Sequence, residues 1–306
     1  MRCEAGIRLA ALVSFAWCVS CRPTLDDRLW LVPRPQIIGL KAAPPEARPG
    51  MAVTFEVVAL DPAGPADTSP TTWAFCSVPK PPAEANVVAP ACLTPATPDA
   101  TGNPVALMIP TDACALFGPD PPQPSPGAPP TRPRDPDATG GYYQPLTIAL
   151  AGSLAVGLER VTCDLPAASL SVARQFLATY RPNQNPTIAG LQFLVEGTDV
   201  DPGAIPAGAD VTLELSWSGG SAETFALFDQ RSASVVEAQE DLTTSWYVTG
   251  GTLDRAATAT SDPAVLSATA IWTAPRASGT VQLAVLLRDS RGGMDVAEAT
   301  LGVTGP

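Results

Sequence analysis

The chain has 306 residues, enough for two ordinary domains, and its 30 acidic and 18 basic residues give a formal net charge of −12 at pH 7. This balance argues against binding to nucleic acid, because phosphate-backbone contacts depend on clustered Lys and Arg. The sequence contains no histidine, which removes the usual general base of Ser and Cys nucleophile systems and the commonest zinc ligand. We therefore expect no metal, no cofactor and no nucleic-acid partner.

The N-terminal segment combines a cationic start with a short apolar run. Arg2 and Arg8 form the positive start, and Leu9–Val19 is apolar apart from one serine. This run is shorter than the roughly 20 residues that a membrane-spanning helix needs, and it has the length of the apolar region of a signal peptide. The pattern predicts export.

The residues after this run resemble the end of a bacterial lipoprotein signal. In that family the signal peptidase cuts before a cysteine that follows small residues, and the cysteine then carries acyl chains. Val19 and Ser20 before Cys21 match the pattern, although Cys18 stands where Leu is usual. The resemblance implies a signal peptide over 1–20, lipidation of Cys21 and a membrane partner through that anchor. Because Arg22 follows the cysteine instead of Asp, it also implies the outer membrane. A signal cleaved without lipidation is the alternative.

Four cysteines remain once the signal and the anchor are set aside: Cys76, Cys92, Cys114 and Cys163. Four cysteines in an oxidising compartment indicate two disulfides, for which three connectivities are open. The pairing that is most economical in chain distance joins Cys76 to Cys92 and Cys114 to Cys163. Free buried thiols are the alternative, and the lack of a CxxC pair argues against a metal site.

A first domain is predicted over 36–182. Residues 21–35 contain three prolines and are expected to be a tether between the anchor and this domain. Strand patterns follow at 37–40, 53–57, 72–76, 146–150 and 158–163. Alternation places Trp73 and Phe75 on one face, as core residues.

A proline-rich insertion, bounded as 77–140, interrupts the first domain. Residues 77–136 hold nearly half of the chain's 35 prolines, which disfavours a continuous sheet because Pro cannot donate to a strand ladder. The stretch from Phe117 to Pro136 is typical of a polyproline-like surface loop. Further along, the periodicity of 167–177 fits a short helix or a strand equally well.

The second half shows a clearer pattern of short strands. Turn formers at 181–186 mark a boundary, so a second domain is predicted over 183–306 and is expected to fold alone. Its candidate strands are 188–195, 210–217, 222–228, 243–248, 268–272, 281–288 and 296–303. Three tryptophans fall in or beside these strands and are expected in the core: Trp217, Trp246 and Trp272. Arg288–Gly293 is predicted to be a hairpin connection.

These residues carry a family resemblance over about 185–305. It rests on Trp246 with Gly250-Gly251-Thr252, on Trp272-Thr273-Ala274-Pro275, on Gly279-Thr280-Val281, and on the turn before Asp295. Together they resemble bacterial immunoglobulin-like extracellular repeats, of the kind found in polycystic-kidney-disease-like modules and in lipoproteins of myxobacteria. The resemblance implies a scaffold or binding module and brings no catalytic residues with it.

Two acidic turns invite comparison with metal sites. Asp199 and Asp201 alternate near Gly203, and whether they bind Ca²⁺ is left open beside the simpler interpretation as a solvated turn. Asp289 and Asp295 flank the double-glycine hairpin and are predicted to stabilise it.

The fold class predicted is all-β, with two immunoglobulin-like β-sandwiches in tandem, the first carrying the long proline-rich insertion. The function predicted is that of a lipid-anchored cell-envelope protein, non-catalytic, which serves as a binding or structural display module with an envelope protein or polysaccharide as partner. The alternative is a carboxylate-dependent hydrolase of envelope polysaccharide, which would need two carboxylates about 5–9 Å apart in a groove.

Overall fold

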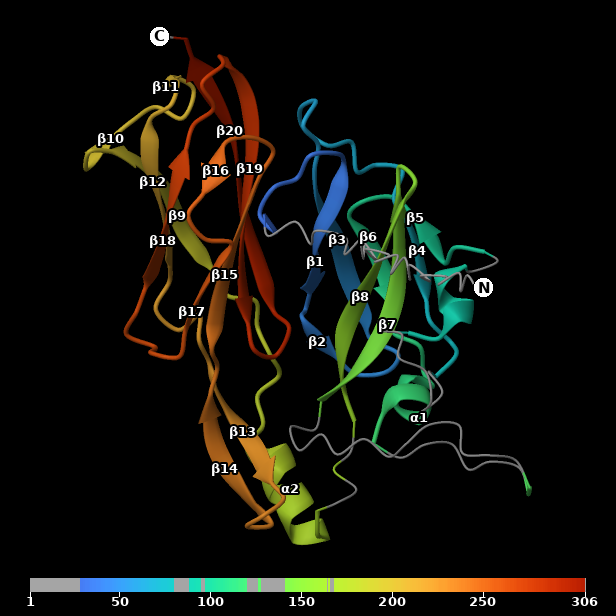
Figure 1. The fold of residues 1–306 in the computed structure, drawn as a ribbon. Helices are drawn as coiled ribbons and strands as arrows, with labels where there is room; N and C mark the ends of the chain where they lie inside the picture. The colour runs from blue at the N-terminus through green and yellow to red at the C-terminus, as the bar shows by residue number, and fades with distance from the viewer. Residues whose placement is uncertain are drawn as a thin grey trace, which may run out of the picture.

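The chain folds into two β-sandwiches that lie side by side (Figure 1). The computed structural model describes residues 28–79, 88–94, 97–119, 126–127, 141–163, 165 and 168–305. The prediction of an all-β chain with two β-sandwiches in tandem is confirmed. No helix in the described ranges is long and apolar enough to cross a membrane. The predicted signal peptide and Cys21 lie outside the described residues.

The first sandwich packs a three-stranded sheet against a five-stranded one. The first sheet has the order β1 (Gln36–Ala43), β3 (Ala52–Leu60), β6 (Val105–Met108). The second has the order β2 (Glu46–Ala47), β8 (Ser153–Thr162), β7 (Gly141–Leu150), β4 (Thr72–Phe75), β5 (Ala100–Thr101). Phe55 joins the sheets, since its ring centroid lies 6.0 Å from those of both Trp73 and Phe75.

The bounds of the predicted insertion need correction, because part of 77–140 belongs to the sandwich. β6 pairs with β3 and β5 pairs with β4, so both sheets take a strand from the proline-rich region. Each of these strands is short, and the described prolines nearest to them, Pro98, Pro104 and Pro110, lie outside the ladders. The helical turn η1 (Pro90–Leu93) and the helix α1 (Ala113–Phe117) complete the described part.

The second sandwich pairs two five-stranded sheets. One has the order β10 (Thr198–Asp199), β9 (Ile188–Val195), β12 (Asp210–Trp217), β18 (Ser267–Thr273), β16 (Thr252–Leu253). The other has the order β11 (Ile205–Pro206), β20 (Met294–Thr304), β19 (Gly279–Asp289), β15 (Leu242–Val248), β17 (Ala257–Thr260). All seven predicted strands of this half are present, within a few residues of their expected bounds.

Tryptophans fill the core of the second sandwich, as predicted. Trp246 and Trp272 are fully buried and Trp217 is 4% exposed. The indole N–H of Trp272 donates to the Gly250 carbonyl at 2.9 Å. Gly251 has a φ of +82°, and a side chain there would collide with the Trp272 ring. The double glycine therefore lets the loop close over this ring.

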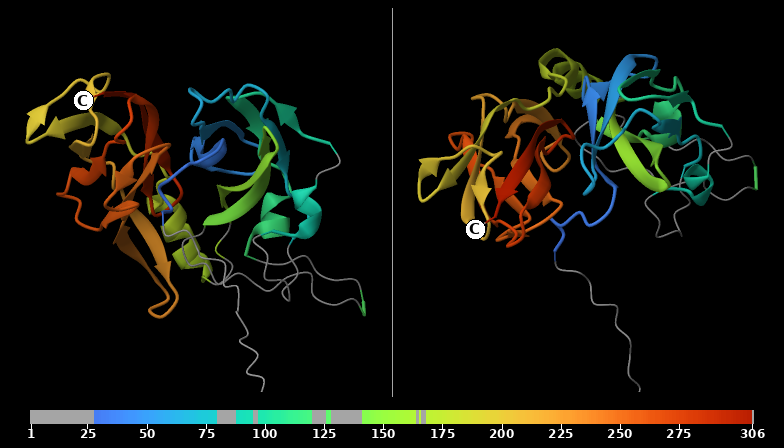
Figure 2. Two further views of the ribbon diagram at one scale, coloured as in Figure 1. Left: turned by 45° about the horizontal axis from the view of Figure 1, so that its top comes forward. Right: turned by 90° about the horizontal axis from the view of Figure 1, so that it is seen from above.

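A helix and a hairpin form a small layer at one end of the molecule. The helix α2 (Leu170–Thr179) packs against the hairpin of β13 (Thr224–Asp229) and β14 (Ser234–Gln239) through a cluster that includes Phe176 and Phe228. This settles the ambiguous stretch at 167–177 as helix, and the Ser169 hydroxyl caps its first turn. Figure 2 shows α2 at the junction of the two sandwiches from two further sides.

An apolar cluster joins the two sandwiches. Ile38, Val58 and Leu60 of the first sandwich pack with Leu286 and Met294 of the second. A side chain at Gly39 would lie about 3.1 Å from both Leu286 and Met294, so a glycine permits this close approach. The cluster holds the outer surface of β19 against the first sandwich.

Candidate functional site: a buried polar junction

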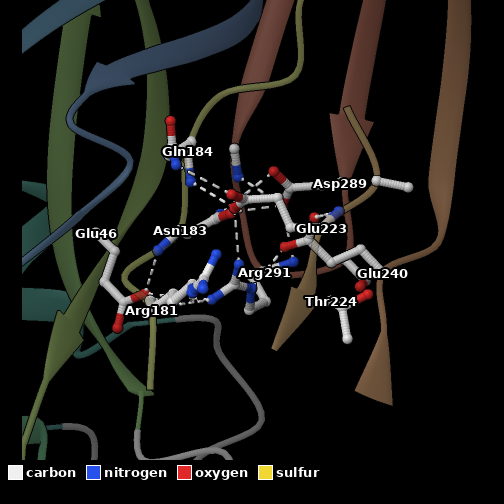
Figure 3. A network of polar contacts seen from close by, with 12 residues as sticks. Glu46, Arg181, Asn183, Gln184, Glu223, Thr224, Glu240, Asp289 and Arg291 are labelled. Carbon is white, nitrogen blue, oxygen red and sulfur yellow. Dashed lines mark hydrogen bonds and ion pairs between the residues drawn. The ribbon is translucent and has the colours of Figure 1, made fainter. Parts of the chain in front are cut away.

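A network of charged and amide side chains lies beside the apolar cluster, where the 181–186 linker passes between the sandwiches (Figure 3). Glu46 enters from β2 of the first sandwich, while Arg291 and Asp289 enter from the hairpin between β19 and β20 of the second. Glu223 and Glu240 stand at the base of the β13–β14 hairpin. We call this group, with Asn183 of the linker, the polar junction.

Arg291 is the centre of the polar junction and is 2% exposed. Its Nε donates to Glu240 Oε1 at 2.5 Å, and its Nη2 donates to Glu223 Oε2 at 2.9 Å. The remaining nitrogen, Nη1, donates to the Arg181 carbonyl at 2.9 Å. The guanidinium also lies over the Phe225 ring, 4.5 Å from its centroid. Each guanidinium nitrogen thus has a partner, which a buried charge requires.

Glu46 binds the linker to the first sandwich. It is 3% exposed and accepts hydrogen bonds from the Tyr180 hydroxyl at 2.6 Å and from the Asn183 backbone N–H at 2.9 Å. The guanidinium of Arg160 lies 3.5 Å away, and that of Arg291 lies 3.9 Å away. One carboxylate of the first sandwich therefore contacts an arginine from each side of the boundary.

Asp289 fixes the hairpin that carries Arg291. One of its oxygens accepts from the backbone N–H groups of Arg291 and Gly293, each at 2.8 Å. The Asn183 amide donates to the same carboxylate at 3.2 Å, which ties the turn to the linker. The prediction that Asp289 stabilises this turn is confirmed. Asp295 acts differently, since it pairs with Lys41 of the first sandwich at 2.7 Å.

Burial raises the pKa values of the carboxyls in this region. The pKa of Glu240 rises to about 7, because burial and the neighbouring Asp289 charge outweigh the opposing effect of Arg291. Burial likewise raises the pKa of Asp289, and it raises the pKa of the Tyr180 phenol to about 12. Proton uptake here would weaken the ion pairs of Arg291.

Glu159 is a further buried carboxyl, located on β8 inside the first sandwich. It is 1% exposed, and burial together with the Glu46 charge raises its pKa to about 9. Its neighbour across the strand pair is Gln144, which is fully buried. Glu159 therefore carries a proton at neutral pH and adds no charge to this core.

The geometry of the polar junction suits a mechanical role better than catalysis. Its carboxylates are occupied by Arg291, Tyr180 and backbone donors, and the side chains of Glu46, Glu240 and Arg291 are nearly inaccessible to solvent. A substrate would have to break these contacts to reach any of them. The arrangement fixes the linker, the hairpin and both sandwiches in one geometry.

An open groove of about 310 Å³ also lies between the sandwiches, on the face formed by β3, β19 and β20. Glu56 and Glu298 line it, and the pKa of Glu298 is raised by partial desolvation of its carboxyl inside the groove and by the Glu56 charge. Both side chains are exposed at its rim. The described lining contains no aromatic side chain on which a sugar ring could stack.

The disulfides follow the most economical of the three pairings. Cys76 bonds to Cys92, and Cys114 bonds to Cys163. The first bond ties η1 to the end of β4, and the second ties α1 to the end of β8. The proline-rich region is thus attached to the five-stranded sheet at two points.

The acidic turn at 199–203 is a local structure. Asp201 accepts a hydrogen bond from the Gly203 N–H at 2.8 Å, and both Asp199 and Asp201 are exposed or nearly so. Within the described ranges, no group of three His, Cys, Asp or Glu side chains is placed to hold a metal ion.

Sequence reasoning missed the polar junction. Arg291 falls in the predicted hairpin turn, Glu46 in none of the predicted strands, and Asn183 in the predicted domain boundary. The one local signal is the run of three amide side chains after Arg181, since such side chains can bind backbone groups and carboxylates. The partners come from opposite ends of the chain, so local patterns could not pair them.

No family model and no curated protein matches the chain. Among solved structures, it is similar to the fibronectin(III)-like modules of Clostridium thermocellum CbhA, with 9% identity, a TM-score of 0.22, and coverage of 87% of this chain and 94% of that one. It is also similar to the Yersinia pseudotuberculosis adhesin InvE, with 14% identity, a TM-score of 0.22, and coverage of 86% and 58%. It is similar as well to domains 4–9 of the surface layer protein SbsC, with 12% identity, a TM-score of 0.19, and coverage of 89% of this chain and 32% of that one. These scores are low, so the fold assignment rests on the sheets themselves.

Proposed function

We propose that this protein is a lipid-anchored module of the bacterial cell envelope, attached through Cys21 to the outer membrane, that binds or displays without catalysis. The observation that carries the proposal is the joining of two sandwiches by a polar junction and an apolar cluster, which gives a double module of fixed shape. Two disulfides support an oxidising compartment. A rigid module presents its outer surfaces at a constant spacing, which suits display or recognition.

The anchor is tested by mass spectrometry of the mature N-terminus and by membrane fractionation. Acylated Cys21, and loss of the protein from the membrane fraction in Cys21→Ala, are expected. A mature product that begins elsewhere, or an unchanged membrane fraction for the variant, would overturn the anchor.

Binding is tested separately with the soluble Cys21→Ser protein. Co-sedimentation with purified envelope polysaccharide and with outer-membrane vesicles distinguishes a polysaccharide partner from a protein in the membrane. Protease treatment of the vesicles should abolish binding to a protein and leave binding to a glycan unchanged. If the protein binds neither the polysaccharide nor the vesicles, a recognition role is contradicted and structural display is the remaining role.

The alternative of a polysaccharide hydrolase rests on Glu56 and Glu298 in the open groove. It predicts release of reducing ends from envelope polysaccharide, with loss of that activity in Glu298→Gln. If the unaltered protein and Glu298→Gln release reducing ends equally, and only at the rate of the buffer control, this alternative is excluded.

A further inference from the structure

The described chain begins on the second sandwich, before it enters the first. The backbone N–H of Val32 donates to the Val248 carbonyl at 2.9 Å, and the N–H of Val248 donates to the Trp30 carbonyl at 2.9 Å. Leu31 and Val248 form a parallel bridge between these bonds. Both backbone groups of Val248 are therefore used by a segment that sequence analysis assigned to a tether. We call residues Trp30–Val32 the strap.

The strap occupies an edge of β15 that β17 leaves open. β17 pairs with β15 only from Leu242 to Ser245, and the last contact on that side is the bond from the Trp246 N–H to the Ala256 carbonyl. Beyond it, the N–H and C=O of Val248 would face no strand. Buried backbone groups need partners, and the strap supplies them. It extends the sheet by one short parallel strand.

The side chains of the strap fill two different clusters. Trp30 is 6% exposed and belongs to the core of the second sandwich, together with Trp246 and Trp272. Val32 is 1% exposed and belongs to the apolar cluster between the sandwiches. Leu29, directly before the strap, is 77% exposed. Burial thus begins sharply at Trp30.

We propose that the second sandwich carries an acceptor site for an extended apolar segment, and that the chain's own strap is its ligand. The site is the free edge of β15 at Val248 with the cavity that Trp30 fills. The residues after the strap, 33–36, are exposed and connect it to β1. Figure 1 shows this blue start of the described chain between the two sandwiches. One consequence rests on the proposed function, namely on the lipid anchor at Cys21. A force on that anchor would reach the second sandwich through the strap, as well as the first sandwich through β1.

The test is to cut the covalent link and ask whether the strap stays bound. A protease site is inserted between Pro33 and Gln36 in the full mature chain carrying Cys21→Ser, which makes the result independent of the anchor. A fluorophore on the N-terminus follows the released fragment by size-exclusion chromatography after cleavage. Retention on the body at micromolar concentration is expected, as is displacement by excess peptide covering residues 27–35.

Two variants and one matched control make the result specific. Trp30→Ala should weaken retention by at least about 100-fold, since the variant leaves the space that the buried indole fills empty. Val32→Asp should also release the fragment, whereas Leu29→Ala should retain it because Leu29 lies in solvent. Circular dichroism of the nicked body shows whether it stays folded. A wild-type fragment that elutes free from a folded body, or equal retention in Trp30→Ala, would overturn the proposal.

Discussion

At the scale of single residues, the polar junction depends on one buried guanidinium. Arg291 contacts Glu240 and Glu223 closely and Glu46 at longer range, so three carboxylates share one cation. Such a group contributes little net stability when it is complete, because desolvation offsets the Coulomb gain. Its removal is costly, since the buried carboxylate of Glu240 would lose its cation and keep only the hydrogen bond from the Glu223 backbone N–H. This asymmetry makes the junction specific for one arrangement of the sandwiches.

Arg291→Met should therefore lower the free energy of unfolding by about 3–5 kcal/mol, the range for breaking one partner out of a buried ion pair. Urea unfolding followed by tryptophan emission measures the change. Arg255→Met is the matched control, because Arg255 pairs with Asp254 at 2.7 Å but is 51% exposed. An exposed pair is worth less than about 1 kcal/mol. Similar losses in both variants would contradict the role given to burial.

Glu159 gives the stability a definite dependence on pH. Its pKa is about 9 in the folded protein and about 4.3 in an unfolded chain, so the folded state holds the proton more tightly. The contribution of Glu159 to stability is therefore complete below about pH 4.3 and falls as the pH rises toward 9, by at most about 1.4 kcal/mol per pH unit. Urea midpoints at pH 5, 7 and 9 measure the slope. Glu159→Gln should reduce it, most clearly between pH 7 and 9, because Glu240 with its pKa of about 7 adds to the slope at lower pH. Glu237→Gln, at an exposed position of β14, should leave it unchanged. An equal slope in all three proteins would refute this assignment.

At the scale of elements, the sequence predicted best where one face of a strand is buried and the other is not. Val211, Leu213 and Leu215 alternate in the sequence and are each fully buried in β12. β14 was missed because neither of its faces is buried, so no alternation marks it. α2 stayed ambiguous because Phe176 is its one buried side chain. The strap was missed because the prolines around Trp30 suggested a tether. Contacts between distant segments leave no local pattern.

The two disulfides should differ in their effect on stability. In the chain-entropy model, the bond between Cys114 and Cys163, 49 residues apart, contributes about 4 kcal/mol, and that between Cys76 and Cys92, 16 residues apart, contributes about 3 kcal/mol. Double Cys→Ser variants of each pair, unfolded in urea under oxidising conditions, should show this order. Under reducing conditions the wild type and both variants should have the same free energy of unfolding. A wild type that stays more stable than both variants after complete reduction would show that the serines themselves cause the loss.

At the scale of the whole molecule, several contacts join the sandwiches, among them the ion pair between Lys41 and Asp295. The apolar cluster holds the outer face of β19, the polar junction holds the linker, and the strap spans the core of the second sandwich and the interface. The sequence predicted two domains and expected residues 183–306 to fold alone. Such a fragment would lack Trp30 from its core and Glu46 from its polar contacts. We therefore expect the two sandwiches to unfold together.

Leu286 offers a way to separate the sandwiches without disturbing either core. It is fully buried in the apolar cluster, whereas its neighbours Val285 and Leu287 point into the core of the second sandwich. In Leu286→Asp, the carboxylate would lie in solvent once the sandwiches part, and it would be buried without a partner if they stayed together. Calorimetry should show one transition for the wild type and two for this variant. Ile271→Asp, which places the same charge on the 44% exposed outer face of β18, should keep the single transition. Two independent transitions in the wild type would mean that the contacts between the sandwiches do not couple their folding.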